Sequence, residues 1–321
     1  MSIWQQLPRP IFILAPMEDV TDTVFRRIIS SVGKPHLYFT EFTNVDGFLS
    51  EGREQVGQRL KFEPEEKPLI AQIWGLKPEN FYKASKEIVE MGFDGIDLNM
   101  GCPQKDVISK GACSALINNH ALAKEIIVAT KEGSKGLPVS VKTRLGFKTN
   151  QREEWIGFLL EQNLAALTIH GRTAQEMSIP SAHWDEIGKV VELRDMMGLT
   201  TPIIGNGDVE SIEEAQEKVE KYHVDGVMIG RGIFHNPWLF DPQKKLENIT
   251  PTERFELLLR HIKLFEDTWG NKKPFQILKK YFKIYIANFS GASDLRAQLM
   301  ECKNGDEVRN IIESIDPKNY E

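Results

Sequence analysis

Short apolar runs alternate with segments of helical periodicity through the first three quarters of the chain. Each run is nearly continuous in aliphatic and β-branched residues, as expected for a strand that is buried on both faces of a parallel sheet. The runs predict eight strands, at residues 11–15, 37–40, 69–73, 95–100, 139–143, 166–170, 202–205 and 226–230.

Apolar residues spaced three and four positions apart predict helices between these strands. The predicted helices cover residues 24–32, 78–91, 122–129, 155–159, 187–193 and 212–219. Ser211 and Glu214 predict a capping box at the start of the last one. Strands that alternate with helices in this way predict an α/β fold, a closed (β/α)8 TIM barrel. An open doubly wound sheet is less favoured, because no G-x-G-x-x-G motif follows the first strand.

The strand pattern stops at about Pro242, whereas helical periodicity continues at residues 257–265 and 275–285. A small all-helical domain is therefore expected to follow the barrel. We predict two domains, an α/β barrel at residues 1–244 and a helical domain at residues 245–321.

Composition narrows the class of protein. The chain has 321 residues, of which 41% are hydrophobic and 27% charged, as in ordinary globular proteins. Its formal net charge of −6 argues against non-specific coating of nucleic acid but permits a local basic face. No apolar run approaches the roughly 20 residues of a membrane span, and residues 1–10 lack a signal-peptide pattern. A cytoplasmic protein is expected.

The three cysteines, Cys102, Cys113 and Cys302, are scattered along the chain. They form neither a disulfide framework nor a zinc motif, so no metal site is expected. Nothing in the sequence demands a partner chain, and we expect a monomer.

Polar or loop-forming residues follow nearly every predicted strand, where a barrel of this kind carries its reactive groups. Glycine-rich turns follow the last two strands, at Gly205–Asp208 and Gly230–Gly232. Backbone N–H groups that converge in such turns can hold a phosphate, and Arg231 adds charge. Either turn alone is equally consistent with a simple tight turn, but two at neighbouring strand ends favour phosphate binding.

Three polar side chains on the strands are candidate ligand contacts. Lys142 is predicted to point inward, where an ammonium group is costly unless it faces an anion or a carbonyl, such as that of a reduced flavin. A structural ion pair is the alternative for this residue. Gln72 offers a donor and an acceptor, which suits the edge of a flavin pyrimidine ring. His170 is as consistent with a core hydrogen bond as with a ligand contact.

Cys102 follows Asn99-Met100-Gly101 at a strand end and precedes Pro103. A lone cysteine is most often a small buried apolar residue. A free thiol has a pKa of about 8.5 and is mostly protonated at neutral pH, so at the mouth of a barrel it can act as a proton donor. Cys113 and Cys302 lack such a setting and are expected to be structural.

Taken in order, these segments resemble the tRNA-dihydrouridine synthase family. The resemblance spans about residues 11–240, and its specificity comes from the ordered set, because each motif alone is weak. The matching segments are Ala15–Met17, Val20–Asp22, Phe25–Arg26, Thr40–Glu41, Gln72–Ile73, Asp97–Pro103, Val141–Gly146, His170–Thr173, Gly205–Asp208, Gly230–Gly232 and Asn236–Trp238. Beyond residue 240 the similarity lies only in helical character and in basic and aromatic residues.

The resemblance implies a barrel that binds flavin mononucleotide (FMN) and reduces uridine in tRNA at the expense of NADPH or NADH. The implied cofactor contacts are Pro16, Met17, Glu18, Gln72, Lys142, His170, Asn206, Gly207, Asp208, Gly230 and Arg231. The first six would lie at or near the isoalloxazine ring and the others at the ribityl phosphate. The expected substrate contacts are Asn99, Lys105, Arg144, Arg172, Lys279, Lys280 and Lys283.

The resemblance also implies a reaction. Hydride from N5 of the reduced flavin would reach C6 of uracil, and Cys102 would protonate C5 from the opposite face. Asp106 and Cys113 depart from the family pattern, in which a basic or hydroxyl residue and a small residue are usual. Neither departure touches the acid, but they leave the modified nucleotide position open.

A base inside folded tRNA must be extruded to reach such a site, and this needs backbone contacts outside the barrel. The segment from Lys272 to Arg296 is basic and is interleaved with aromatic residues, which suits RNA. The aromatic residues are Phe275, Tyr281, Phe282 and Tyr285. An ordinary amphipathic helix with a solvated lysine face is equally consistent with this pattern.

Two other classes of protein stay open from the sequence. A small-molecule FMN reductase of the dihydroorotate or dihydropyrimidine type would share the barrel but has no need of a basic helical domain. A barrel that binds RNA without a cofactor is the second class, and the combination of Lys142, His170 and two glycine turns counts against it.

Overall fold

The computed structural model describes residues 2–320, which divide into two compact units. The first unit comprises the chain up to Thr23 and Pro35–Gly230, and the second comprises Val24–Lys34 and the chain from Arg231 onwards. The strand pattern predicts a limit after residue 244, whereas the two units part at Gly230. The difference arises because residues just after Gly230 contact the second unit's helices: the Arg254 guanidinium lies 5.8 Å from the centre of the Trp238 ring.

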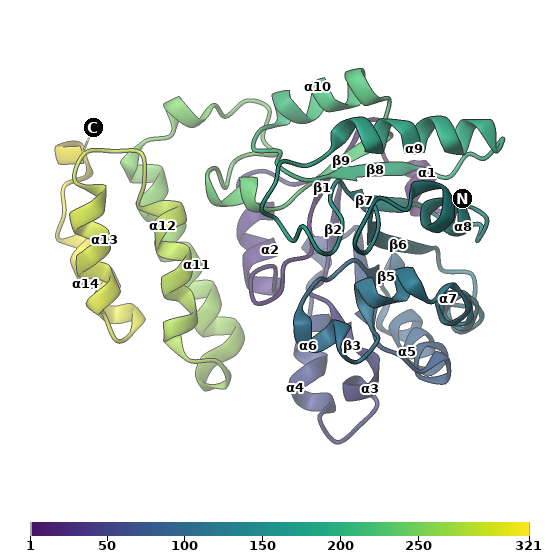
Figure 1. Cartoon of the computed structure of the whole chain (residues 1–321). Helices are drawn as coiled ribbons and strands as arrows, with labels where there is room; N and C mark the ends of the chain where they lie inside the picture. Colours follow the sequence, from purple (N-terminus) through teal and green to yellow (C-terminus); the bar gives the residue numbers. More distant parts are fainter. Residues whose placement is uncertain (1, 321) are drawn as a thin grey trace. The chain divides into compact units, whose positions relative to one another are not determined.

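Eight parallel strands close into a barrel in the first unit (Figure 1). Hydrogen-bonded neighbours follow the order β2-β1-β9-β8-β7-β6-β5-β4, and the pairing of Tyr38 with Leu69 joins β2 to β4. The strands are β1 (Ile11–Leu14), β2 (Leu37–Phe39), β4 (Leu69–Trp74), β5 (Gly95–Met100), β6 (Val139–Arg144), β7 (Leu167–His170), β8 (Ile203–Asn206) and β9 (Gly226–Ile229). The predicted barrel is confirmed. The two-residue strand β3 (Thr43–Asn44), which pairs with the end of β4, was not predicted.

The longer helices of the first unit lie outside the strands in Figure 1. They are α5 (Pro78–Met91), α7 (His120–Gly133), α9 (Trp184–Met196) and α10 (Ile212–Tyr222). Pro78 occupies the first turn of α5, and Gly92 ends it in the left-handed conformation with φ of 84°. The predicted helix near Trp155 is a π-helical turn (Arg152–Ile156) that runs into α8 (Gly157–Leu160).

The predicted capping box of α10 is only half formed. Ser211 Oγ accepts a hydrogen bond from the Glu214 N–H at 3.0 Å, as expected. The Glu214 carboxylate, however, accepts from the N–H of Glu210 at 2.9 Å. It therefore lies one residue further back than the reciprocal bond of a capping box requires.

Short helices fill the loops of the first unit. They are α1 (Ile3–Gln6), α3 (Val45–Phe48), α4 (Arg53–Gly57) and α6 (Lys105–Ile108). Helix α1 places Trp4 in the barrel core, where it is fully buried with Ile11, Ile13 and Phe39. Since Ile11 begins the first strand, Trp4 closes the barrel at the amino ends of its strands.

The second unit is helical. Its helices are α2 (Thr23–Ser30), which begins one residue before the unit, α11 (Pro251–Trp269), α12 (Phe282–Tyr285), α13 (Ala292–Glu301) and α14 (Gly305–Glu313). Helix α11 starts with a capping box between Thr250 and Glu253. The predicted helix at 275–285 is a 3₁₀ segment (Phe275–Tyr281) followed by α12, and α13 and α14 were not predicted.

Neither a membrane span nor a metal cluster emerges from residues 2–320. No helix there is both long and apolar enough to cross a bilayer. Nor does any group of three or more His, Cys, Asp or Glu side chains in this range have the arrangement of a metal site.

Candidate active site

The cysteine loop leaves β5 at the carboxyl end of the barrel. Asn99 Oδ1 accepts hydrogen bonds from the N–H groups of Gly101 and Cys102, at 3.1 and 3.0 Å. From the neighbouring strand, Arg144 Nε donates to Gly101 O at 2.8 Å. The ends of β5 and β6 therefore fix the backbone at Cys102 from two sides.

Cys102 lines a cavity of 670 Å³ at this end of the barrel, together with Trp74, Arg59 and Glu18. Its thiol is partly exposed, whereas Cys113 and Cys302 are buried. Burial raises the pKa of the Cys102 thiol, and the Gln104 N–H and the charge of Arg144 oppose this without reversing it. A thiol with a raised pKa stays protonated at neutral pH, so it is suited to give up a proton rather than to attack as a thiolate.

A second group of polar side chains lies inside the barrel behind the cysteine loop. Gln72 is fully buried; its Nε2 donates to Asp97 Oδ2 at 2.7 Å, and its Oε1 accepts from Asn99 Nδ2 at 3.2 Å. Ser140 Oγ donates to the other oxygen of Asp97 at 2.6 Å. Burial raises the pKa of Asp97 to about 6, although the hydrogen bonds from Ser140 and Gln72 and the charge of Lys142 act against it.

Lys142 reaches across the barrel to β8. Its Nζ donates to Asn206 Oδ1 at 3.0 Å, and Asn206 Nδ2 donates to Met228 O at 2.8 Å. Burial lowers the pKa of Lys142 to about 8, assisted by the charge of Arg144 and opposed by that of Asp97. Because its hydrogen-bond partner is neutral, the structural ion pair considered above does not form among residues 2–320.

His170, Arg172 and Asp208 come together from the loops after β7 and β8. Arg172 forms an ion pair with Asp208, and its guanidinium lies 3.3 Å from His170 Nε2. A guanidinium only donates, so Nε2 accepts and the neutral imidazole carries its proton on Nδ1. The predicted flavin contacts His170 and Asp208 are thus held in place by a residue expected to touch the substrate.

Arg144 and Arg172 are more deeply buried than substrate contacts usually are, at 8% and 2% exposure. Arg144 donates to the carbonyl oxygens of Gly101, Thr173 and Met177. The structure therefore shows both arginines holding loops, and direct contact with a substrate stays a prediction for each.

The turn after β1 carries Pro16, Met17 and Glu18, all partly exposed. Thr21 Oγ1 accepts from the Met17 N–H at 2.9 Å and locks this turn. Glu18 pairs with Arg59, whose Nε donates to Glu18 Oε1 at 2.8 Å. This ion pair forms one wall of the cavity that Cys102 lines.

The glycine turn after β8 requires glycine at position 207. Gly207 has φ of 130°, and a Cβ there would lie 2.7 Å from the Ala182 Cβ. We expect Gly207→Ala to lower the free energy of unfolding by more than the roughly 1–3 kcal/mol of backbone strain alone. Gly136→Ala is the matched control, because Gly136 has φ of 92° but no atom within 4 Å of its Cβ position. Urea unfolding of both variants measures the difference, and equal losses would contradict the steric argument.

The remaining predicted contacts lie on short helices and on the second unit. Lys105 is exposed on α6, and Lys280 and Lys283 are exposed in the second unit. Lys279 donates to the Met300 carbonyl. Of the four aromatic residues interleaved with these lysines, Tyr281, Phe282 and Tyr285 are buried, whereas Phe275 is partly exposed. The aromatic part of the RNA-contact hypothesis is wrong for the three buried rings, because they lie in the core of the helical unit.

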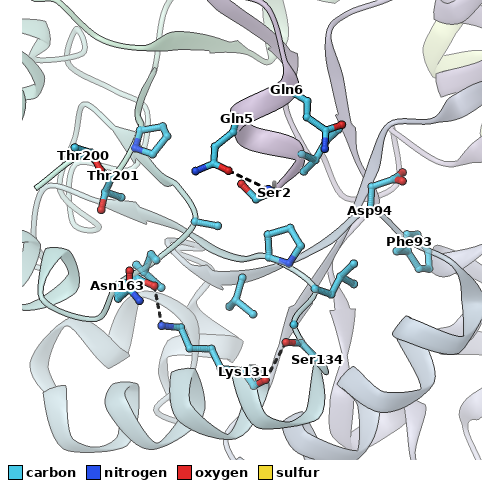
Figure 2. Close-up of a pocket in the computed structure, with 18 of the residues that line it drawn as sticks. Ser2, Gln5, Gln6, Phe93, Asp94, Lys131, Ser134, Asn163, Thr200 and Thr201 are labelled. Atoms are coloured by element: carbon cyan, nitrogen blue, oxygen red, sulfur yellow. Dashed lines mark hydrogen bonds between the residues drawn. The ribbon is translucent and has the colours of Figure 1, made fainter.

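A larger pocket, of 1110 Å³, lies at the amino ends of the strands (Figure 2). It is lined by Asp94, Pro138 and Pro202, which directly precede β5, β6 and β8. Figure 2 shows Lys131 donating to the carbonyl of Asn163, at 2.8 Å. Its ammonium is therefore engaged within the protein, and this pocket gathers none of the predicted site residues.

Comparison with known proteins decides the family. The family model described as dihydrouridine synthase matches residues 13–318. The chain is 45% identical to "Probable tRNA-dihydrouridine synthase 2" of Bacillus subtilis (strain 168), over 99% of this chain and 97% of that protein. It is 46% identical to "Probable tRNA-dihydrouridine synthase" of Staphylococcus aureus (strain COL), over 98% and 96%.

The chain belongs to the dihydrouridine synthase family. Among solved structures, morphinone reductase is similar to this dihydrouridine synthase with a TM-score of 0.53 and 13% identity, over 73% of this chain and 85% of that one. At this identity the likeness shows a shared barrel fold and nothing more.

Several residues of the site were not predicted, among them Asp97, Arg59 and Trp74. Asp97 was missed although a carboxylate in the middle of an apolar strand is a readable signal. Arg59 and Trp74 reach the Cys102 cavity from the loop before β4 and from the end of β4. Their sequence neighbourhoods carry no comparable signal, so only the fold reveals them.

Proposed function

We propose that this dihydrouridine synthase uses FMN to reduce the C5=C6 bond of uridine in tRNA, with NADPH or NADH as the reductant. We also propose that the protein is cytoplasmic and acts as a monomer. The observation that carries the proposed activity is the position of the Cys102 thiol, which lines a cavity at the carboxyl end of the barrel and has a pKa that burial raises. Lys142 and Asn206, which lies in the first glycine turn, are hydrogen-bonded to each other inside the same barrel. The names of the relatives from B. subtilis and S. aureus support the choice of tRNA.

The residues present fit a bound FMN. An ammonium group has three N–H donors. Lys142 uses one of them to bind Asn206, so two remain for a carbonyl or anionic edge of the isoalloxazine ring. Within residues 2–320 the N–H of Gly207 has no backbone acceptor outside the regular helices and strands, which suits a phosphate oxygen. At Gly230 a Cβ would lie 3.7 Å from its nearest neighbour, so the protein itself leaves room there.

Bound FMN would supply the hydride that reaches C6 of the uracil ring. Cys102 would donate its proton to C5, and the resulting thiolate would face the charges of Arg144 and Lys142, both of which favour the ionised form. Pro16, Met17, Gln72, His170, Asn206 and Asp208 would complete the cofactor site. Asn99 would lie beside the base.

Exposed lysines would bind the tRNA backbone. Lys105, Lys280 and Lys283 project into solvent, where each can neutralise a phosphate. Lysine contacts of this kind position the RNA without reading its sequence. They distinguish the proposal from a small-molecule reductase, which needs none of them.

The proposal is tested in two arms. Nucleoside mass spectrometry of tRNA from a strain lacking this gene should show dihydrouridine missing at defined positions. The purified holoprotein should convert unmodified tRNA with NADPH far faster than free uridine. Equal rates on free uridine and tRNA would favour the small-molecule reductase, and a colourless protein that takes up no FMN would favour a non-catalytic barrel.

A further inference from the structure

A buried hydrogen-bond chain connects Asp97 to the backbone of the cysteine loop. It runs from Asp97 Oδ2 to Gln72 Nε2 (2.7 Å), from Gln72 Oε1 to Asn99 Nδ2 (3.2 Å), and from Asn99 Oδ1 to the N–H groups of Gly101 and Cys102 (3.1 and 3.0 Å). Gln72 and Asp97 are fully buried, and Asn99 is 8% exposed. Solvent therefore offers little replacement for a broken link, and each lost bond leaves a buried polar group unsatisfied.

The strand register brings these residues together. Gln72 on β4 lies directly beside Asp97 on β5, and Asp97 lies beside Ser140 on β6. Ser140 Oγ donates to Asp97 Oδ1 at 2.6 Å and so holds the carboxylate from the other side. The chain thus begins at a carboxylate that two neighbouring strands fix in place.

The chain has a direction. A carboxylate accepts hydrogen bonds and does not donate them, so Asp97 requires the NH2 of Gln72 to face it. Gln72 must then present its oxygen to Asn99, and Asn99 must present its own oxygen to the loop. The backbone N–H groups of Gly101 and Cys102 can only donate, so both ends demand the same orientation of the two amides.

We propose that Asp97 is a positioning residue for Cys102: acting through Gln72 and Asn99, it sets the orientation of two buried amides and holds the cysteine loop beside the cavity. Its purpose rests on the proposed function, since the position of the thiol matters only where the thiol is the proton donor. The hydrogen-bond chain itself does not depend on the identity of the substrate.

Reversing the chain tests this proposal. In Asn99→Asp, the carboxylate introduced at position 99 still accepts hydrogen bonds from the loop, but its other oxygen faces the Gln72 oxygen and the two repel. Turning the Gln72 amide would not relieve this, because the Gln72 oxygen would then face the carboxylate of Asp97. Adding Asp97→Asn allows the Gln72 amide to turn. The amide introduced at position 97 can then donate to the Gln72 oxygen, and the Gln72 NH2 can donate to the carboxylate introduced at position 99. Adding Asp97→Leu instead removes the same charge but provides no donor, and is the matched control.

Hydrogen exchange of the peptide that covers residues 99–104, measured by mass spectrometry on the purified holoprotein, reports on the two loop amides. Asn99→Asp should speed their exchange by about 10-fold. The double variant with Asp97→Asn should return to within about twofold of the wild type, and the one with Asp97→Leu should not. Equal exchange rates in the two double variants would show that the faster exchange in Asn99→Asp comes from charge repulsion alone, and would overturn the proposal.

Single variants decide the matter if Asn99→Asp does not fold. Asp97→Leu should speed exchange of the same amides by about 10-fold, whereas Ser140→Ala, which leaves the chain intact, should stay within about twofold of wild type. Equal exchange in these two variants would also overturn the proposal. Alkylation by iodoacetamide then reports whether the thiol has moved, because Cys113 and Cys302 are buried. None of these measurements needs tRNA turnover, so a failure of the proposed function would be seen separately.

Discussion

Replacing Cys102 with alanine is expected to lower the rate of dihydrouridine formation by about 10²–10⁴, the usual contribution of a positioned proton donor. The thiol is partly exposed at the cavity and stays protonated because burial raises its pKa. FMN content and tRNA affinity should be unchanged, because the side chain is small and no predicted FMN-phosphate contact depends on it. Single-turnover assays on unmodified tRNA, with the flavin spectrum recorded in parallel, measure these quantities.

Cys302→Ala is the control for this variant, since Cys302 is buried in the helical unit at 4% exposure. Its turnover should match the wild type. In the wild type, turnover should persist at neutral pH, and the part of it that depends on the thiol should fall as the pH passes the raised pKa of Cys102, because the thiol then loses its proton. Undiminished turnover in Cys102→Ala would remove the acid role.

Replacing Lys142 with methionine is expected to have opposite effects on activity and on stability. On the proposed function Lys142 faces the flavin, so its replacement should lower turnover by about 10²–10³ and weaken FMN binding. The FMN-free protein, in contrast, should become more stable at pH 7. Burial of the ammonium lowers its pKa from 10.5 to about 8, so the folded state disfavours the charged form and loses up to about 3 kcal/mol below pH 8.

The sign of this effect gives a pH test. Because the folded pKa lies below the unfolded one, the wild-type FMN-free protein should gain stability as the pH rises from about 8 to 10.5. Lys142→Met should lack that rise, whereas Lys263→Met, at a position with 73% side-chain exposure, should keep it. Thermal unfolding of the three proteins across this range suffices, and parallel curves would show that the ammonium is not held in a desolvated position.

The architecture was predictable because the barrel strands are nearly continuous apolar runs, whose limits the structure places within a residue or two. Strand β3 was not, since two residues carry no period. The interleaved aromatic and basic residues after Lys272 show where pattern alone misleads. Alternation in sequence was consistent with one mixed RNA-binding face, but helical geometry turns Tyr281 and Tyr285 into the core and leaves Lys280 and Lys283 outside.

The candidate site was predictable as a set of strand ends, but its internal contacts were not. The partnership of Gln72 with Asp97 depends on the register between β4 and β5, which no local pattern specifies. The same holds for His170 and Asn206, which lie side by side on β7 and β8. Arg144 and Arg172 illustrate the limit most clearly, because an arginine at a strand end has the same sequence signature whether it binds a ligand or ties loops together.

Trp4 has a consequence for the order of events. Its indole is fully buried beside Ile11 and Ile13 of the first strand and blocks access to the barrel interior from the amino ends of the strands. On the proposed function, NAD(P)H and the uracil base would therefore both reach the flavin from the carboxyl end of the barrel, one after the other. Steady-state rates measured with varied NADPH and tRNA should accordingly give parallel double-reciprocal lines. Such lines indicate a ping-pong mechanism, in which the oxidised nicotinamide leaves before the tRNA binds.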